Sequence, residues 1–139
     1  FDRVLLMFTS FGYFEDAENE AVIKAILRAL KPGGMMLLDT LNRDTVLKGL
    51  PPEQVIEKND DLLINRFSFD SQRSRLINRR VVIRNGIRKE KPFSIRVYSP
   101  IELSDMLRRL NVTDYQMVDE NSLPISSESR KIIVIAKKP

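Results

Sequence analysis

The spacing of apolar residues divides the first part of the chain into two runs with a helical segment between them. Residues 4–8 form a short, continuous apolar run, which is typical of a strand buried on both faces of a parallel sheet. A second run, 35–41, carries Asp39 near its end. Between the runs, apolar residues recur at helical spacing over 17–30, and Asp16 is placed to cap that helix. Strand, helix and strand with short connections predict a right-handed βαβ unit.

The pattern changes to period two between residues 55 and 98. Turn signals at 59–61, 70–72 and 85–86 separate the alternating segments, and we expect three or four antiparallel strands. Asn85-Gly86 predicts a type I′ hairpin, because both residues tolerate positive φ.

The last forty residues return to mixed α and β patterns. Ser99 and Glu102 predict a capping box, with Pro100 at the first position of a helix over 100–110. Two strands, near 113–118 and 131–136, follow and are expected to pair antiparallel. We therefore expect one compact α/β domain, in which 1–54 and 99–139 form the core and 55–98 form an antiparallel β insert.

The composition excludes several classes of chemistry. The chain has neither Cys nor His, which rules out disulfides, Ser-His and Cys-His catalysis and the usual zinc sites, so we expect no metal centre. It carries no signal-peptide pattern and no apolar stretch near 18 residues, so we expect a cytoplasmic location without membrane contact. A chain that begins with Phe1 and an apolar run is interpreted as cut within a fold.

Charge is segregated along the chain. The net charge is +4, yet residues 66–96 alone contain ten basic and only two acidic residues. Such strands suit a partner with phosphate groups, such as RNA, and a binding or assembly module that holds a polyanion is the alternative function. A solvated, arginine-rich outer sheet face is the simpler interpretation, and we favour it.

Three segments together resemble a known family. The strings FDRV at 1–4, FTSFGYF at 8–14 and LKPGGMMLLD at 30–39 recur in this order in class I, S-adenosylmethionine-dependent methyltransferases. The resemblance extends over the whole chain and implies a partial Rossmann-like sheet made of the last four strands of that fold. Their spatial order would be fourth, fifth, seventh and sixth, with an antiparallel C-terminal hairpin.

The resemblance also assigns candidate site residues. Open α/β sheets bind ligands outside the carboxyl ends of their strands, where the loop at 8–14 would lie. Aromatic side chains there would suit a sulfonium cation, although they would equally suit a hydrophobic plug over the sheet edge. Four residues at or beyond the end of the second strand could orient an acceptor: Asp39, Asn42, Arg43 and Asp44. Asp39 could equally cap the next turn. The implied cofactor-binding residues are Phe8, Thr9 and Ser10, and the implied substrate-binding residues are Phe11, Tyr13, Phe14, Asn42, Arg43, Arg96 and Tyr98.

The resemblance implies a methyltransferase that is incomplete in these 139 residues, because the family's glycine-rich cofactor loop precedes the matching region. We expect S-adenosylmethionine to serve the complete enzyme and to bind this chain weakly or not at all. The expected acceptor is a small molecule, and no general base is identified. The first strand would be covered by another copy of the chain, as a homo-oligomer, or by the missing N-terminal half.

Overall fold

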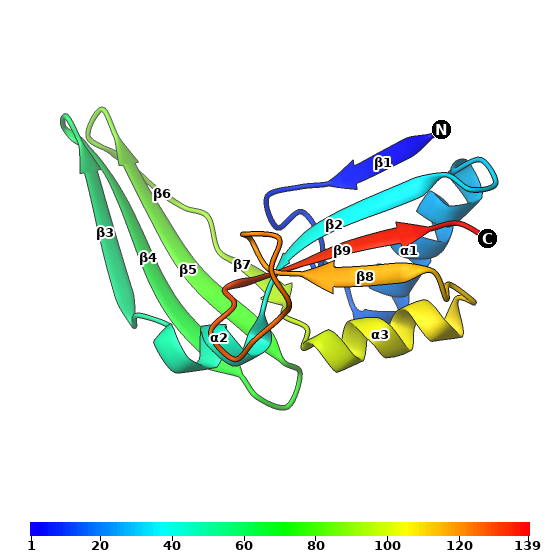
Figure 1. The fold of residues 1–139 in the computed structure, drawn as a ribbon. Helices are drawn as coiled ribbons and strands as arrows, with labels where there is room; N and C mark the ends of the chain where they lie inside the picture. The colour runs from blue at the N-terminus through cyan, green and yellow to red at the C-terminus, as the bar shows by residue number, and fades with distance from the viewer.

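The computed structural model describes residues 1–139 as two sheets joined at an angle (Figure 1). In the first sheet, β1 (Arg3–Leu6) runs parallel to β2 (Met35–Leu41), and β9 (Lys131–Lys137) lies antiparallel between β2 and β8 (Tyr115–Val118). The order β1-β2-β9-β8 confirms the expected α/β class, the antiparallel C-terminal hairpin and the predicted spatial order of the four strands.

Two helices cover one face of the first sheet and form the main core with it. They are α1 (Asp16–Ala29) and α3 (Pro100–Arg109). Alternate residues of β2 and β9 point toward these helices, because successive side chains of a strand alternate between faces. The buried members of this core include Ile23, Met36, Leu38, Leu107, Ile132 and Val134.

The second sheet contains five strands, one more than the most that we predicted. They are β3 (Glu53–Lys58), β4 (Asp61–Asp70), β5 (Arg75–Arg84), β6 (Ile87–Glu90) and β7 (Phe93–Arg96). Both β6 and β7 pair with β5, and they form separate strands because Lys91 and Pro92 interrupt the ladder between them.

Local signals at turns and caps were confirmed with one exception. Asn85 and Gly86 both have positive φ, as a type I′ turn requires. Ser99 and Glu102 form the predicted capping box at α3. The prediction that Asp16 caps α1 was wrong: Glu15 is the N-cap residue, and Asp16 is the first residue of the helix.

A short helix that the sequence pattern did not predict lies at the junction of the sheets. This is α2 (Arg43–Gly49), and Asn42 caps it by accepting a hydrogen bond from the Asp44 amide at 3.2 Å. Val46 of α2 packs against a small second core centred on Leu76 and Ile95 of the second sheet.

None of the three helices has the length and apolar character needed to span a membrane.

Candidate functional site

A cavity of about 850 Å³ lies between the two sheets. Its walls come from segments that are far apart in the sequence: the loop after β1, helix α2, the second sheet and the segment leading into β9. Lining residues include Thr9, Tyr13, Val46, Leu50, Gln54, Phe67, Asn78, Arg80, Phe93, Arg130 and Lys131.

The loop after β1 has a strained backbone at the edge of this cavity. Phe8 and Thr9 both adopt left-handed conformations, with φ of 57° and 58°. Such conformations are costly for residues other than glycine and cluster at functional sites. Phe8 exposes 86% of its surface, and its amide donates to the Oδ2 of Asp39 at 3.2 Å. The strained turn is therefore held at the carboxyl ends of β1 and β2.

Asp39 forms a buried ion pair next to this turn. Its Oδ2 lies 2.9 Å from the Nζ of Lys131, and the Asp39 side chain is only 4% exposed. The other oxygen, Oδ1, is buried and has no hydrogen-bond partner within the protein. Lys131 lines the cavity, so the pair connects the loop after β1 to the cavity wall.

A row of amide side chains crosses the second sheet on the side that faces the cavity. Gln54, Asn65 and Asn78 come from the adjacent strands β3, β4 and β5. Asn65 donates to the Oε1 of Gln54 at 3.3 Å and accepts from the Nδ2 of Asn78 at 2.9 Å. The Nε of Arg80 donates to the same Asn65 oxygen at 2.9 Å, and the Arg80 guanidinium carbon lies 4.8 Å from the centroid of the Phe93 ring.

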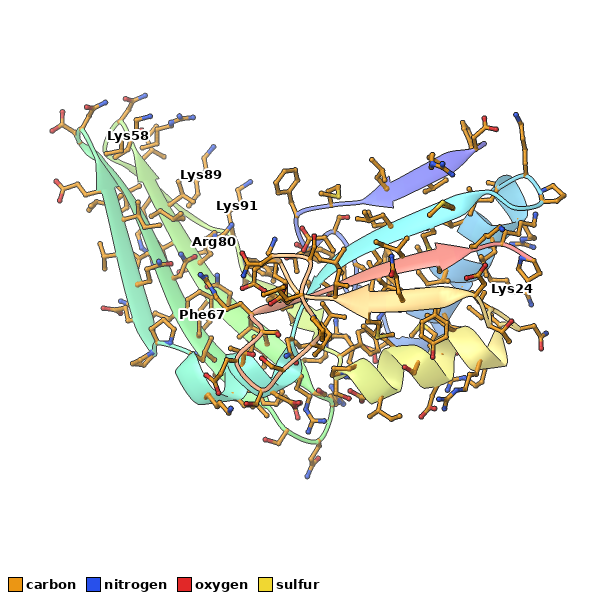
Figure 2. All side chains as sticks on the ribbon, in the orientation of Figure 1. Lys24, Lys58, Phe67, Arg80, Lys89 and Lys91 are labelled. Atoms are coloured by element: carbon orange, nitrogen blue, oxygen red, sulfur yellow. The ribbon has the colours of Figure 1, made fainter.

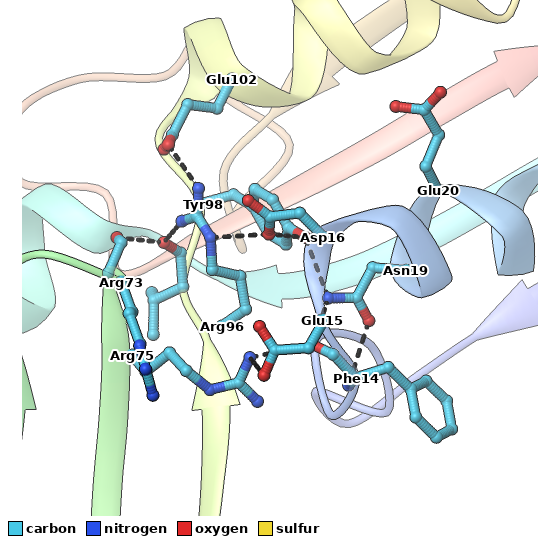
Figure 3. A network of polar contacts seen from close by, with 12 residues as sticks. Phe14, Glu15, Asp16, Asn19, Glu20, Arg73, Arg75, Arg96, Tyr98 and Glu102 are labelled. Atoms are coloured by element: carbon cyan, nitrogen blue, oxygen red, sulfur yellow. Dashed lines mark hydrogen bonds and ion pairs between the residues drawn. The ribbon is translucent and has the colours of Figure 1, made fainter.

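A second polar network lies around Arg96, at the start of both long helices (Figure 3). The Nε of Arg96 lies 2.9 Å from Asp16, and its Nη2 lies 2.6 Å from Glu102. Its Nη1 donates to the Val97 carbonyl at 2.7 Å, and the guanidinium stacks on the ring of Tyr98 at 4.4 Å. Arg96 therefore connects β7 to the N-termini of α1 and α3.

The same network shifts three pKa values. Burial raises the pKa of the Tyr98 hydroxyl, and the charge of Asp16 adds to this. Burial alone would raise the pKa of Glu102, but hydrogen bonds from Arg96 and Ser99 outweigh it and leave that pKa below its ordinary value. Burial alone would lower the pKa of Arg96, yet the hydrogen bond and charge of Glu102 raise it. All three groups therefore keep their usual charge at neutral pH.

The network also fixes the end of the loop after β1. Asn19 donates to the Tyr98 hydroxyl at 3.0 Å and to the Phe14 carbonyl at 2.8 Å. Gly12 has a φ of +101°, and its carbonyl accepts from the Arg96 amide at 2.7 Å. A Cβ at Gly12 would overlap the Arg96 carbonyl oxygen, so glycine is required where the loop crosses β7.

The predicted cofactor-binding and aromatic residues do not all lie together. Thr9 and Tyr13 line the cavity, and the Tyr13 ring lies 6.3 Å from that of Phe93. Phe8 and Ser10 are exposed in the same loop, next to Thr9. Phe11 instead points into the main core, where it stacks on Tyr98 with 5.6 Å between ring centroids.

The other predicted substrate-binding residues lie outside the cavity. Phe14 is exposed, and its carbonyl accepts from Arg75 at 2.9 Å. Asn42 is buried, where it caps α2 and donates to the Ser129 carbonyl at 2.8 Å. Arg43 lies 4.0 Å from Glu102, in the polar network around Arg96. Arg96 and Tyr98 are buried in that network, so the structure gives them packing and hydrogen-bonding partners within the protein.

Sequence reasoning missed the amide row and the pair formed by Asp39 and Lys131. One signal was available: Asn65 and Asn78 interrupt period-two apolar faces in strands that a turn places side by side. The ion pair joins residues 92 positions apart, and no local pattern reveals it. No group of three or more acidic residues gathers in a way that could hold a metal ion.

Much of the positive charge in the second sheet is neutralised within the protein. Five of the ten basic residues in 66–96 form ion pairs with acidic residues. These five are Arg66, Arg75, Arg84, Arg88 and Arg96. The arrangement favours a solvated arginine-rich sheet over an extended polyanion-binding surface.

Comparison with solved structures supports the fold. No protein-family model matches the sequence, and no match was found among curated proteins. An S-adenosylmethionine-dependent methyltransferase from Clostridium acetobutylicum superposes with a TM-score of 0.82 at 18% identity, over 99% of this chain and 58% of its own. The CcbJ methyltransferase from Streptomyces caelestis gives 0.78 at 18% identity, over 99% of this chain and 57% of its own.

A third similar structure is CalS10, an amino pentose methyltransferase from Micromonospora echinaspora with S-adenosylmethionine bound. It superposes with a TM-score of 0.67 at 15% identity, over 100% of this chain and 58% of its own. The chain thus has the fold of part of these methyltransferases and spans less than two thirds of their length.

Proposed function

We propose that the chain forms the C-terminal part of the catalytic fold of an S-adenosylmethionine-dependent methyltransferase, and that a small polar acceptor binds in the cavity between the two sheets. The observation that carries this proposal is the strained turn at Phe8 and Thr9. It lies at the carboxyl ends of β1 and β2 and borders the cavity. In open α/β folds this edge of the sheet is where ligands bind.

The turn suits the methionine end of the cofactor. When bound, the cofactor supplies a methyl group on a sulfonium cation. The exposed Phe8 ring offers an aromatic face to such a cation, and the hydrogen bond from its amide to Asp39 holds the turn in place. The unpartnered Oδ1 of Asp39 offers a buried acceptor for an N–H group nearby.

The cavity walls suit an acceptor with both ring and polar groups. Tyr13 and Phe93 contribute aromatic surface, while Asn78 and Arg80 contribute hydrogen-bonding groups. Catalysis of methyl transfer rests mainly on aligning the acceptor with the methyl group, and the absence of His and Cys does not conflict with it. Arg96 and Tyr98 would act as positioning residues, because they hold the loop that borders the cavity.

Two features of the first sheet support its completion by further protein. The outer edge of β1 pairs with no strand. On the face without helices, Leu5, Leu37 and Ile135 lie opposite one another, and Leu5 is largely exposed. An open edge and an apolar face are both avoided in finished folds. We propose that the remainder of the methyltransferase sheet covers them, and pairing with a second copy is the competing outcome.

The test compares two lengths of the protein in calorimetric titrations with S-adenosylmethionine. The 139-residue chain should give no saturable heat at micromolar concentrations. The chain extended by the residues that its reading frame encodes before Phe1 should bind one equivalent with saturation. Absence of binding by the extended chain would refute the proposal, and tight binding by the 139-residue chain would refute the requirement for further residues.

A companion measurement separates the two ways of covering β1. Light scattering should give a monomer mass for the extended chain at concentrations where the 139-residue chain self-associates. A stable dimer of the extended chain that is broken by Leu5→Lys would instead assign the β1 edge to contact between copies.

A further inference from the structure

Four cations without an ion pair gather on the side of the second sheet that faces the cavity. Lys89 lies opposite Val82, and the Lys91 amide donates to the Arg80 carbonyl at 2.8 Å. Residues that pair across antiparallel strands share a face, which places Lys89, Lys91 and Arg80 on the same face as Asn78. Lys58 extends the set at the tip of β3, as Figure 2 shows.

No acidic side chain of the second sheet is free to balance these cations on that face. Glu120, which comes from outside the sheet, also lines the cavity, where its Oε2 accepts from the Lys131 amide at 3.1 Å. The nearest acidic side chain in the register, Asp61, already forms an ion pair with Arg84 at 3.2 Å. Arg80 uses its Nε for Asn65 and stacks on Phe93, while its two terminal nitrogens have no hydrogen-bond partner in the protein. The face therefore offers a guanidinium at the cavity wall with two lysines beyond it (Figure 2).

The amide row fixes the orientation of Asn78. Arg80 can only donate, so the Asn65 atom that it meets must be the oxygen. Asn78 must then present its NH₂ group to that oxygen, which leaves the Asn78 Oδ1 as the free atom. This oxygen is buried and has no partner, and the whole residue is 0% exposed. A buried acceptor without a donor is costly, and a ligand with an O–H or N–H group relieves that cost.

We propose that this face binds a small ligand that carries both a hydroxyl group and an anionic group, as in a hydroxylated phosphate ester or carboxylate. Arg80, Lys89 and Lys91 hold the anion, and Asn78 accepts a hydrogen bond from the hydroxyl group. A small ligand fits better than RNA because the free cations adjoin a cavity, whereas most of the other arginines of the sheet are paired internally. If the chain is part of a methyltransferase, as proposed above, the methyl acceptor belongs to this class of hydroxylated anions.

Three probes separate the two parts of the proposed subsite: ribose 5-phosphate, inorganic phosphate and ribose. Backbone amide shifts of the 139-residue chain, recorded at low salt, report binding. Ribose 5-phosphate should bind about fivefold more tightly than phosphate, as expected for one added hydrogen bond, and should shift the amides of β5 and β6. Ribose alone should give no measurable binding.

Matched lysine variants test the position of the anion. Lys89→Gln and Lys91→Gln should each weaken binding of both phosphate compounds roughly threefold to fivefold, as expected for loss of one exposed charge. Lys24→Gln is the control, since Lys24 lies exposed on α1 without an ion pair and the substitution removes the same charge (Figure 2). Equal weakening by Lys24→Gln would show only a net-charge effect and would overturn the proposed anion position.

Variants of Asn78 test the hydroxyl contact. Asn78→Leu should abolish the preference for ribose 5-phosphate over phosphate and leave phosphate binding unchanged. Asn78→Ala serves the same purpose if the leucine variant does not give a folded spectrum. An unchanged preference in a folded variant would overturn the role of Asn78.

Binding of RNA, of phosphate and of the cofactor tests different parts of the proposals. A short single-stranded RNA that binds more tightly than ribose 5-phosphate, and that loses this affinity in both lysine variants, would replace the small ligand with a polyanion. No phosphate binding, together with saturable S-adenosylmethionine binding by the extended chain, would refute only this subsite. Phosphate binding without saturable cofactor binding by the extended chain would refute the methyltransferase proposal, and with it the identification of this ligand as the methyl acceptor, but would leave the anion and hydroxyl subsite in place.

Discussion

The two sheets differ in what their buried faces are made of. The first sheet places Met36, Leu38, Ile132 and Val134 under two helices, in a core with almost no solvent contact. The second sheet has only a small apolar cluster near α2, and beyond it a row of amides and cations faces the cavity. The first arrangement stabilises the fold, while the second leaves hydrogen-bonding groups that a ligand can satisfy.

Solvent exposure follows the same division. Every residue of β3 is exposed, including Ile56 at 45%, although the strand is fully paired with β4. In the first sheet even the edge strand β1 packs two partly buried residues, Val4 and Leu6, against the core. Backbone pairing and a few polar side-chain contacts, such as the pair of Arg66 with Glu53, therefore hold the outer part of the second sheet, whereas side-chain burial holds the first.

The largest expected effect on stability is the difference between removing an apolar side chain from the first sheet and removing one from the second. Leu38→Ala should lower the free energy of unfolding by roughly 2 to 5 kcal/mol, because it leaves a cavity under α1 and α3. Ile56→Ala should cost less than about 1 kcal/mol, since that side chain is half exposed. Urea titrations followed by circular dichroism measure both. Equal losses would contradict the contrast between the sheets.

The next largest effect on stability is expected at Arg96, which connects β7 to the N-termini of α1 and α3. Arg96→Met should destabilise the fold by about 3 kcal/mol, because Asp16 and Glu102 lose their buried partner. Arg108→Met, which removes an exposed pair with Asp105, is the control and should cost at most about 1 kcal/mol. The same urea titrations apply. A loss for Arg96→Met as small as that of the control would contradict its role.

The pH dependence of stability should report the same network. The folded pKa of Glu102 lies below its ordinary value, so its contribution is present at neutral pH and is lost as the pH falls through the acidic range in which glutamate titrates. Glu102→Gln should therefore be less stable than the parent at neutral pH and lose less stability on acidification. Thermal melts at pH 7 and pH 4 measure this. Parallel losses in both proteins would contradict the assignment.

The smallest effect on stability is expected in the amide row of the second sheet, which includes Asn65 and Asn78. Asn78→Leu should change the free energy of unfolding by less than about 1 kcal/mol. It removes a buried acceptor that has no partner, which offsets the loss of the bond to Asn65, and the Asn65 oxygen keeps its bond from Arg80. Asn65→Leu should cost more, because it removes the oxygen that two donors share. Comparing the two variants in urea separates a ligand-facing amide from a structural one. A larger loss at Asn78 would contradict that distinction.

The sequence predicted the first sheet well because its signals are local and strong. Continuous apolar runs, a helical stripe and the capping box at Ser99 each identify an element without knowledge of the rest. Helix α2 escaped prediction because seven residues give too little periodicity, and α1 begins one residue earlier than expected because Glu15 takes the cap.

The candidate site was harder to predict, for a physical reason. Residues such as Asn78, Arg80 and Lys131 meet only when strands from distant segments come together, and their partners are set by register. Phe11 and Tyr98 were predicted to bind substrate because they are aromatic and belong to segments expected near the site. Both are buried in the main core. Residue type and proximity along the chain do not distinguish a cavity wall from core packing.

The most direct test is an amide-shift map of the extended chain on addition of S-adenosylhomocysteine, the product of methyl transfer. Within residues 1–139, we expect the largest shifts on Phe8, Thr9 and Ser10 and on Asp39 at the end of β2. Shifts centred instead on the outer strands of the second sheet or on α3, with the loop after β1 unchanged, would contradict it.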